Sequence, residues 1–396
     1  MPSVRLLEVR NTYKWGGGPD KTILLSAEQH NRSRVSVVVA YIRDARDREF
    51  RISEKARTCR LTYYEIEERG KFDPRVIWAL RDLVLQHDIN LIHSHDYKSD
   101  LFAYLVRKLC WRKHIVLLST AHGWALVGPR GNLYRRLDMS LMRRFDHLIA
   151  VSHATKKQMV TDGVPECLIS VIHNAIDIDA WSPTHSPGDL RSKLNLSWAF
   201  PVVGYVGRLT EEKDLDVWLR AAAYLSKQYS RAHFVLVGEG RDEGLREELQ
   251  KLAVSLKMSD HVTFLGYQEN VLPIYSTFDI FLLSSRREGL CNSILEAMSL
   301  GLPIVSTDCG GSKELVVDGH TGFLLKQRDV NGLARALVAL ADDDQLRALM
   351  GRAGRERVEQ EFSFRHRLQR IEDLYESILG VGPKRASAPD VVGQPV

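Results

Sequence analysis

The chain has 396 residues, of which 44% are hydrophobic and 27% are charged, a composition typical of a soluble globular protein long enough for two domains. It contains no run of roughly eighteen apolar residues, and its first residues turn polar too soon for a signal peptide, so we expect neither a transmembrane segment nor secretion. Its five scattered cysteines form no CxxC pair and predict reduced thiols in a cytoplasmic protein.

Charge is distributed unevenly along the chain. Residues 1–180 contain 29 Lys and Arg against 21 Asp and Glu, a net charge of +8, whereas the remaining 216 residues contain 26 against 29, a net charge of −3. A basic first half predicts an anionic partner, which could be a membrane surface, a phosphate-bearing substrate or nucleic acid.

In chain order, short β-branched runs alternate with helical stretches in both halves. Such alternation predicts α/β architecture, with two tandem Rossmann-like domains built on parallel sheets. The seam, at about 177–201, holds three prolines and no clear period, so it is predicted to be a linker. The predicted strands are 5–9, 34–41, 91–95, 114–120, 147–152 and 168–174, then 201–207, 233–240, 261–266, 279–285 and 302–308; the clearest helices of the first half are 73–87 and 99–110.

Two cations follow the first predicted strand of the second half. Arg208 and Lys213 stand between the strand end at Val206 and a helix expected to begin near Asp214. Cations beside a helix N-terminus favour anion binding, with Arg offering a planar fork and Lys a mobile point charge. Two solvated surface cations would be an equally good interpretation of this stretch alone.

Two carboxylates flank a later helix start. Glu288 is expected in the loop after the strand at 279–285, and Glu296 in a helix over 292–301, with Leu290, Cys291 and Asn292 at the start of that helix. Eight residues of helix rise roughly 12 Å, the scale of a nucleotide sugar from ribose to sugar ring. One carboxylate could therefore bind the ribose diol and the other the sugar hydroxyls. Beyond the next strand, Gly310 and Gly311 would let a ligand or a backbone approach closely.

The first half offers further candidates at strand ends. Gly16, Gly17 and Gly18 lie between the first strand and the first helix, where backbone N–H groups could meet a phosphate. His93, His95, Asp96 and His122 follow later strands; a metal site is an alternative for them, but their spacing matches no metal motif. His122, followed by a glycine, is the best candidate for a substrate contact. The glycines 238, 240 and 244 fail the dinucleotide fingerprint by one residue.

Taken together, these stretches resemble the retaining glycosyltransferases of the GT-B fold, family 4. The resemblance rests on "EGLCNSILE", an E-x7-E motif, with "GRLTEEK", "GGSKELVVDGHTGFLL", "STAHGW" and "VIHNAIDIDAW". It implies an acceptor-binding Rossmann-like domain at 1–178, a nucleotide-sugar-binding one at 179–363, and a helix at 364–380 crossing back to the first domain. The tail at 381–396 has no periodicity, which predicts disorder. Two departures are Ala175, where the family has glycine, and the GGGPDK loop.

The resemblance also implies roles for single residues. It makes Arg208 and Lys213 the pair that neutralises the diphosphate, Glu296 the ribose ligand and Glu288 the acid beside the donor sugar. His122 would lie near the reacting sugar, and Gly17 and Gly18 on the phosphate side. The catalytic candidates are thus His122, Glu288, Arg208 and Lys213, and the donor-binding candidates also include Leu290, Cys291 and Asn292.

The resemblance further implies transfer of a sugar from a UDP- or GDP-linked donor to a hydroxyl, with retention of anomeric configuration. No metal or other cofactor is expected, and no nucleic acid partner. The acceptor would be a glycan or a lipid-linked molecule. A UDP-sugar epimerase of the same fold and a non-catalytic sugar-nucleotide-binding protein are the alternatives.

A last prediction concerns location. Residues 131–150 are predicted to form an amphipathic helix, with Leu133, Tyr134, Leu137, Leu141, Phe145 and Leu148 in one arc. Its arginines 135, 136, 143 and 144, with Arg107, Lys108, Trp111, Arg112 and Lys113, would rest on an anionic membrane at the inner face of the cell. A core-packed helix with a solvated basic face is the plainer interpretation.

Overall fold

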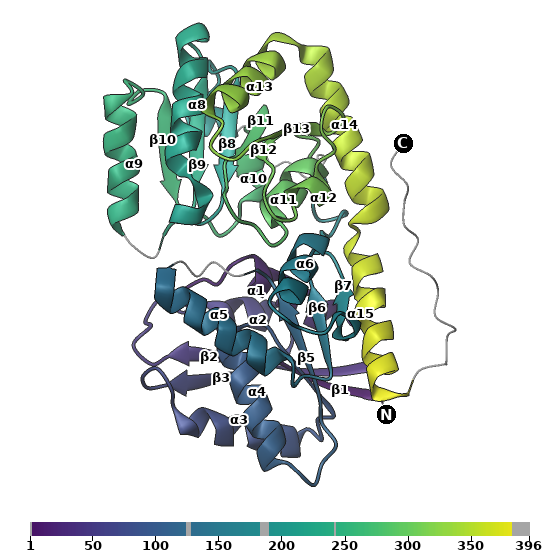
Figure 1. The fold of residues 1–396 in the computed structure, drawn as a ribbon. Helices are drawn as coiled ribbons and strands as arrows, with labels where there is room; N and C mark the ends of the chain where they lie inside the picture. Colours follow the sequence, from purple (N-terminus) through teal and green to yellow (C-terminus); the bar gives the residue numbers. More distant parts are fainter. Residues whose placement is uncertain (1, 124–127, 183–189, 241–242, 382–396) are drawn as a thin grey trace.

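The protein is described by a computed structural model that covers residues 2–123, 128–182, 190–240 and 243–381, with the side chains of 128–134 and 243 left out. Two parallel sheets, each flanked by helices, stand one above the other (Figure 1). The fold class is therefore the one expected from the alternation of strands and helices.

The first sheet has seven strands in the order β3-β2-β1-β4-β5-β6-β7. The interior strand β1 is buried at Val4 and over Leu6–Val9, and it pairs in parallel with β2 and β4, with Leu6 opposite Val37 and Leu91. The strands are β1 (Val4–Asn11), β2 (Val35–Asp44), β3 (Thr62–Glu68), β4 (Leu91–Ser94), β5 (Val116–Ala121), β6 (His147–Ala150) and β7 (Ile169–Val171).

Helices cover both faces of this sheet, and two of them begin at an aspartate N-cap. Asp73 accepts a hydrogen bond from Arg75 N at the start of α3, and Asp96 caps α4 through Lys98 N and Ser99 N. The helices are α1 (Gly18–Gln29), α2 (Ile52–Thr58), α3 (Pro74–Gln86), α4 (Tyr97–Leu109), α5 (Gly128–Met142) and α6 (His153–Thr161), with a 3-10 turn at Glu166–Leu168.

The second sheet has six strands in the order β10-β9-β8-β11-β12-β13. They are β8 (Val202–Val206), β9 (His233–Val237), β10 (Val262–Gly266), β11 (Ile280–Leu283), β12 (Ile304–Thr307) and β13 (Gly322–Leu325). The helices are α7 (Leu190–Lys193), α8 (Leu215–Gln228), α9 (Glu243–Ser255), α10 (Leu272–Tyr275), α11 (Asn292–Ser299), α12 (Ser312–Leu315), α13 (Val330–Asp342) and α14 (Asp344–Glu361), with a 3-10 turn at Glu211–Lys213.

A final helix, α15 (Phe364–Leu379), follows α14 and runs down beside the first sheet (Figure 1). Its Ile371 and Tyr375 belong to the same buried cluster as Val4 and Leu6 of β1. Arg34, just before β2, forms ion pairs with Glu372 and with two more acids on this helix. The last described helix of the chain therefore completes the core of the first sheet.

Several sequence expectations need correction. β3 and β13 were not predicted, because β3 is an edge strand rich in polar residues and β13 has only four residues. The strand expected at 279–285 ends at Leu283. Part of the expected linker packs into the second core, since Leu196 and Ala199 are buried there.

The expected helix at 131–150 is also wrong in its second half. α5 ends at Met142, and residues 147–150 form strand β6. The face of α5 that is buried carries Asp138 and Met139, whereas Leu137 of the predicted apolar arc is 59% exposed. The side chains of Leu133 and Tyr134 lie outside the described residues, as do residues 382–396 of the expected tail. Among the described residues, no helix combines the length and the apolar character needed to cross a bilayer.

Candidate active site between the two domains

The carboxyl ends of the two sheets face each other, and loops from both meet there. A Cβ placed on Gly18, after β1, would lie 2.8 Å from Asn292 Nδ2, and one on Gly289 would lie 2.2 Å from the carbonyl oxygen of His122. Asn174 Nδ2 also donates to Asn292 Oδ1 at 2.8 Å across the same boundary. Ligands of open α/β sheets bind at such strand ends, so these loops outline the candidate site.

A buried ion pair joins two of the predicted residues. Lys213 Nζ lies 2.6 Å from Glu288 Oε1, and the side chains are only 13% and 10% exposed. Ser285 Oγ donates to the same oxygen at 2.7 Å. Burial lowers the pKa of Lys213, but the Glu288 carboxylate more than offsets this and raises that pKa well above its ordinary value. Lys213 therefore carries a fixed positive charge at the end of the sheet.

Arg208 lies on the turn that follows β8. Tyr205 Oη donates a hydrogen bond to the backbone carbonyl of Arg208 at 2.8 Å, and this bond fixes the turn. The Arg208 side chain is exposed, and in the described part of the chain it forms no ion pair with a carboxylate, so its guanidinium can accept an anion. The nearby Gly238, with φ +129°, approaches Gly207 O so closely that its Cβ would lie 1.9 Å away, which explains one glycine of the false dinucleotide fingerprint.

The glycine pair after β12 supports the Glu288 loop. A Cβ on Gly310, where φ is +52°, would lie 1.8 Å from Glu288 O, and one on Gly311 would lie 2.4 Å from Gly289 O. Backbone approach thus accounts for both glycines. Between Glu288 and the start of α11, Leu290 and Cys291 are buried. Burial raises the pKa of the Cys291 thiol to about 12, so the thiol stays protonated.

Glu296 lies deeper in α11 and is held from both domains. Tyr275 Oη donates to Glu296 Oε2 at 2.8 Å, and Lys21 Nζ of α1 lies 3.1 Å from Glu296 Oε1. The carboxylate borders a pocket between the domains that Lys21, Trp181 and Asn292 also line. The helix-rise argument for the spacing of Glu288 and Glu296 is wrong, because α11 begins only at Asn292 and Glu288 lies in a loop.

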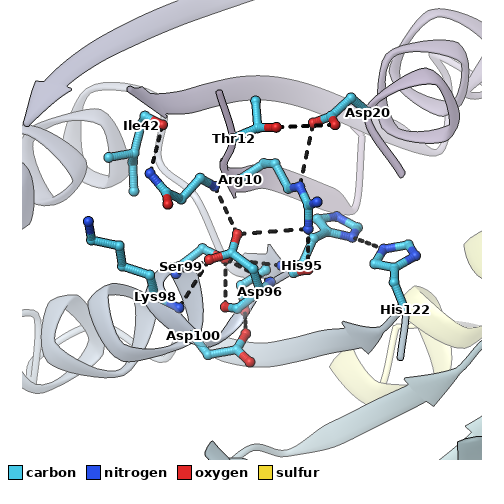
Figure 2. A network of polar contacts seen from close by, with 12 residues as sticks. Arg10, Thr12, Asp20, Ile42, His95, Asp96, Lys98, Ser99, Asp100 and His122 are labelled. Atoms are coloured by element: carbon cyan, nitrogen blue, oxygen red, sulfur yellow. Dashed lines mark hydrogen bonds and ion pairs between the residues drawn. The ribbon is translucent and has the colours of Figure 1, made fainter. Parts of the chain in front are cut away.

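The loop at Gly16–Gly18 is held by its own neighbours. Asp20 Oδ2 accepts the N–H of Gly17 at 2.6 Å, and Asp20 in turn lies 3.4 Å from Arg10 Nε (Figure 2). Arg10 also donates to the carbonyl of His95 at 2.5 Å. A phosphate approaching Gly17 would therefore compete with a carboxylate, whereas Gly18 faces Asn292.

His122 follows β5 and lies at the end of a row of buried polar groups. His122 Nε2 lies 3.2 Å from His95 Nδ1, and His95 Nε2 lies 2.5 Å from Glu8 Oε2 (Figure 2 shows the two histidines). Burial, with a smaller contribution from the neighbouring His95, lowers the pKa of His122 well below its ordinary value, so its imidazole is neutral. Glu8, His93 and His95 also lie close enough together to hold a metal ion.

Two further interdomain contacts were not predicted. Glu314, in the short helix α12 that follows the glycine pair, accepts hydrogen bonds from His153 N at 2.8 Å and from Ala154 N at 3.0 Å, and it lies 2.8 Å from His173 Nε2. The Glu314 carboxylate of the second domain thus caps α6 of the first domain. "GGSKE" places Glu314 beside a predicted loop, which is the one signal in the sequence that could have indicated it.

The second contact is an aromatic stack. Trp15 and Tyr267 lie with their ring centres 4.2 Å apart and their planes 14° from parallel, and Lys55 Nζ lies 3.3 Å from Tyr267 Oη. Tyr267 follows β10 of the second sheet, so this stack holds the glycine-rich loop against the other domain. No pattern of charge or periodicity distinguishes these rings from other surface aromatics.

Two family models match the chain. One described as Glycosyltransferase Family 4 matches residues 16–180, and one described as Glycosyl transferases group 1 matches residues 189–357.

Relatives of known name and solved structures are similar to this chain over most of its length. The D-inositol 3-phosphate glycosyltransferase of Corynebacterium jeikeium is 30% identical over 319 residues, which cover 76% of this chain and 75% of that protein. The UDP-Gal:alpha-D-GlcNAc-diphosphoundecaprenol alpha-1,3-galactosyltransferase of Escherichia coli is 27% identical over 311 residues, 76% of this chain and 79% of that one. The crystal structure of Anabaena Alr3699/HepE in complex with UDP and glucose is similar with a TM-score of 0.83 at 22% identity, over 94% of this chain and 100% of that one.

Proposed function

Because the chain belongs to the family 4 glycosyltransferases with the GT-B fold, we propose that it transfers a sugar from a UDP-linked donor, with retention, to a hydroxyl of a lipid-linked acceptor. The observation that carries this proposal is the gathering of four side chains at the carboxyl end of one sheet, facing the other domain: Arg208, Lys213 and Glu288 from the segments that follow strands, and Glu296 from helix α11. Uridine is favoured as the base because the similar Anabaena structures hold UDP and the Escherichia coli relative is named for UDP-Gal.

Charge stabilisation is the main catalytic contribution expected from these residues. As the bond to the diphosphate breaks, negative charge grows on the leaving group, and Arg208 and the permanently charged Lys213 stabilise it in the closed space between the domains. Glu288, anchored by Lys213 and Ser285, is the residue to which we assign the acceptance of hydrogen bonds from hydroxyls of the donor sugar. Retention corresponds to attack from the face that the diphosphate leaves, with a donor phosphate oxygen taking the acceptor proton.

Nucleotide binding would change one interdomain contact. Glu296 is the proposed ribose ligand, yet one of its oxygens is paired with Lys21 and the other with Tyr275. We propose that the ribose diol replaces the more exposed of these two partners, Lys21, at Glu296. Since Lys21 is half exposed, this exchange costs little, as exposed ion pairs contribute about 0–1 kcal/mol.

The test is a donor and acceptor screen with purified protein. UDP is expected to raise the melting temperature more than GDP, because a ligand that binds only the folded state stabilises it. Release of UDP from UDP-galactose, UDP-glucose or UDP-N-acetylglucosamine should then depend on a glycosylated lipid diphosphate. Product NMR reads the anomeric configuration. Stabilisation by GDP alone, or a product with inverted configuration, would contradict the donor or the retaining part of the proposal respectively.

A membrane-facing surface is the second part of the proposal. Trp111, just after α4, is 74% exposed, and the Arg112 guanidinium lies 4.8 Å from its ring centre, an amphipathic pair suited to a bilayer interface. Other arginines of the predicted basic edge are held locally, since Arg107 pairs with Asp146 and Arg135 with Asp162. We therefore centre this surface on Leu109–Arg112.

Vesicle sedimentation tests this surface. Wild type should sediment with vesicles containing anionic lipid at low salt and be released at high salt. A Trp111→Ser, Arg112→Gln variant should stay in the supernatant, whereas Trp198→Ser, which removes an exposed aromatic residue from the second domain, should behave like wild type. If wild type and the Trp111 variant remain equally in the supernatant at low salt, the membrane surface is refuted.

A further inference from the structure

Three ionisable side chains from adjacent strands form a row that ends at the cleft. Glu8 lies in β1, His95 follows β4 and His122 follows β5, and these strands are neighbours in the sheet. Glu8 Oε2 lies 2.5 Å from His95 Nε2, and His95 Nδ1 lies 3.2 Å from His122 Nε2. Glu8 and His95 are 2% and 5% exposed, so solvent cannot substitute for these contacts. Neither Glu8 nor His95 has a part in the donor site described above.

The protons in this row can be assigned from the chemistry of the groups. Burial raises the pKa of Glu8, but His93 and His95 more than offset this and hold that pKa well below its ordinary value, so Glu8 is a carboxylate and can only accept. Burial lowers the pKa of His95 to about 3, so its ring is neutral and carries one proton. That proton must be on Nε2, which faces Glu8. His95 Nδ1 is then a lone pair, and the proton between the two rings must belong to His122 Nε2.

The consequence appears at the other nitrogen of His122. A neutral imidazole with its proton on Nε2 has a lone pair on Nδ1. His122 Nδ1 is buried and has no hydrogen-bond partner among the described residues. A buried acceptor without a donor is unfavourable, and a hydroxyl from a bound molecule would supply the missing hydrogen bond. The carbonyl of the same residue lies against Gly289, beside the Glu288 loop.

We infer that Glu8 and His95 are positioning residues that fix the tautomer of His122, so that its Nδ1 accepts a hydrogen bond from a sugar hydroxyl in the cleft. This inference rests on the proposed function for the identity of the hydroxyl, but not for the tautomer itself. Reversing the tautomer would place an N–H where the hydroxyl proton should be accepted, and the substrate would lose its contact.

A metal site is the competing interpretation of the same cluster. Glu8, His93 and His95 satisfy the distance requirement for three ligands. Each ring nitrogen of the two histidines already has a protein partner, however. His93 Nδ1 lies 2.8 Å from Tyr375 Oη and His93 Nε2 lies 2.7 Å from Thr120 Oγ1, while His95 faces Glu8 and His122. A metal ion would have to break these contacts, so the row is better explained as a hydrogen-bonded support.

The tautomer can be measured directly in the full-length protein without substrate. In protein labelled with 15N-histidine, long-range 1H–15N correlations distinguish the Nε2–H tautomer, the Nδ1–H tautomer and the imidazolium, and the signals of His122 are those absent from a His122→Gln variant. Wild type at neutral pH is expected to show only the Nε2–H form at His122. A population of the Nδ1–H form or of the imidazolium in wild type would overturn the inference.

Variants test the role of the two supports. His95→Leu removes the acceptor for His122 Nε2–H and should give mixed tautomers, with kcat lowered about 10–100-fold, the range seen when a supporting hydrogen bond to a functional group is lost. His95→Asn keeps an oxygen near the place of Nδ1 and should recover the single tautomer and part of the lost kcat. Glu8→Gln, which can donate as well as accept, should relax the tautomer of both histidines.

Other outcomes separate the alternatives. An unchanged tautomer and a kcat within twofold of wild type in folded His95→Leu would overturn the positioning role. If added Zn²⁺ converts the His93 and His95 signals to those of zinc-bound histidine, the positioning role would be overturned in favour of a metal site. Absence of transfer by wild type with every donor tested would refute the proposed function and leave the tautomer result standing.

Discussion

Replacing Lys213 with methionine should destabilise the second domain, whereas the same change at Arg208 should not. Methionine keeps the length of the Lys213 side chain but removes its charge, which leaves the Glu288 carboxylate with Ser285 as its remaining polar side-chain partner among the described residues. Removing one partner of a buried ion pair typically lowers the free energy of unfolding by about 3–5 kcal/mol. Because both side chains retain slight exposure, we expect the lower end of that range, about 3 kcal/mol.

Urea unfolding measures this loss of stability, and hydrogen exchange shows which part of the protein is destabilised. With a slope of about 3 kcal/mol per molar urea, the midpoint of the second domain should fall by about 1 M in Lys213→Met. Exchange should speed up in peptides of β8 and α8, whose Trp218 is fully buried. Lys213→Met combined with Glu288→Gln removes both charges and should recover most of the lost stability, although activity stays low. If Lys213→Met unfolds at the wild-type urea concentration, the reasoning from a buried pair is refuted.

The remaining predictions concern turnover, binding, metal and pH. Arg208→Ala should lower kcat about 100-fold, as loss of one charge-stabilising group does, with unfolding free energy within about 0.5 kcal/mol of wild type because the side chain is exposed. Glu296→Ala should weaken UDP binding by roughly 10–100-fold in calorimetry, and Lys21→Met should tighten it because a competitor for Glu296 is removed. Transfer should continue in excess EDTA. Between pH 6.5 and pH 3, His95 binds a proton in the unfolded chain but not in the folded protein. The free energy of unfolding should therefore decrease as the pH is lowered, by about 2 kcal/mol at pH 5, and it should decrease less in His95→Asn.

Each of these predictions has an outcome that would contradict it. Wild-type kcat in Arg208→Ala at saturating donor would remove this residue from diphosphate stabilisation. Unchanged UDP affinity in Glu296→Ala would make the ribose assignment wrong, and weaker binding in Lys21→Met would mean that Lys21 assists the nucleotide instead of competing with it. A loss of transfer in EDTA that magnesium restores would require a metal. Equal pH sensitivity of wild type and His95→Asn would refute the neutral buried ring.

The sequence predicts the architecture and the meeting of Lys213 with Glu288 because both depend on local pattern. Strands alternating with helices favour parallel sheets, and the carboxyl ends of the strands of one sheet lie at one edge, so Lys213 and Glu288, which follow the neighbouring strands β8 and β11, lie near each other. The partners of these residues are harder to predict because they come from distant parts of the chain. Lys21, which pairs with Glu296, is separated from it by 275 positions.

Other misses have different physical causes. The helix predicted at 131–150 is wrong in its second half because the prediction used only the helical spacing of apolar residues. Phe145 lies in the turn after α5 and Leu148 in strand β6, so their apolar character does not indicate a helix. Glu8 is itself a signal of such a distant partner, since a charged residue between the apolar residues of an interior strand must be paired when it is buried. The stacking of Trp15 on Tyr267 had no such signal.

The position of α15 has a consequence for how the protein is made on the ribosome. Tyr375 supplies a hydroxyl next to Glu8 and His93, and Ile371 fills the core beside β1, so the first domain lacks part of its interior until the last described helix has been synthesised. About 200 residues separate β7 from the end of α15, which at 5–20 residues per second is a delay of roughly 10–40 s. During that interval the N-terminal half is exposed to chaperones with all its strands but an incomplete core, and the second domain completes its core first. The order of synthesis is thus the reverse of the order in which the two interiors are completed.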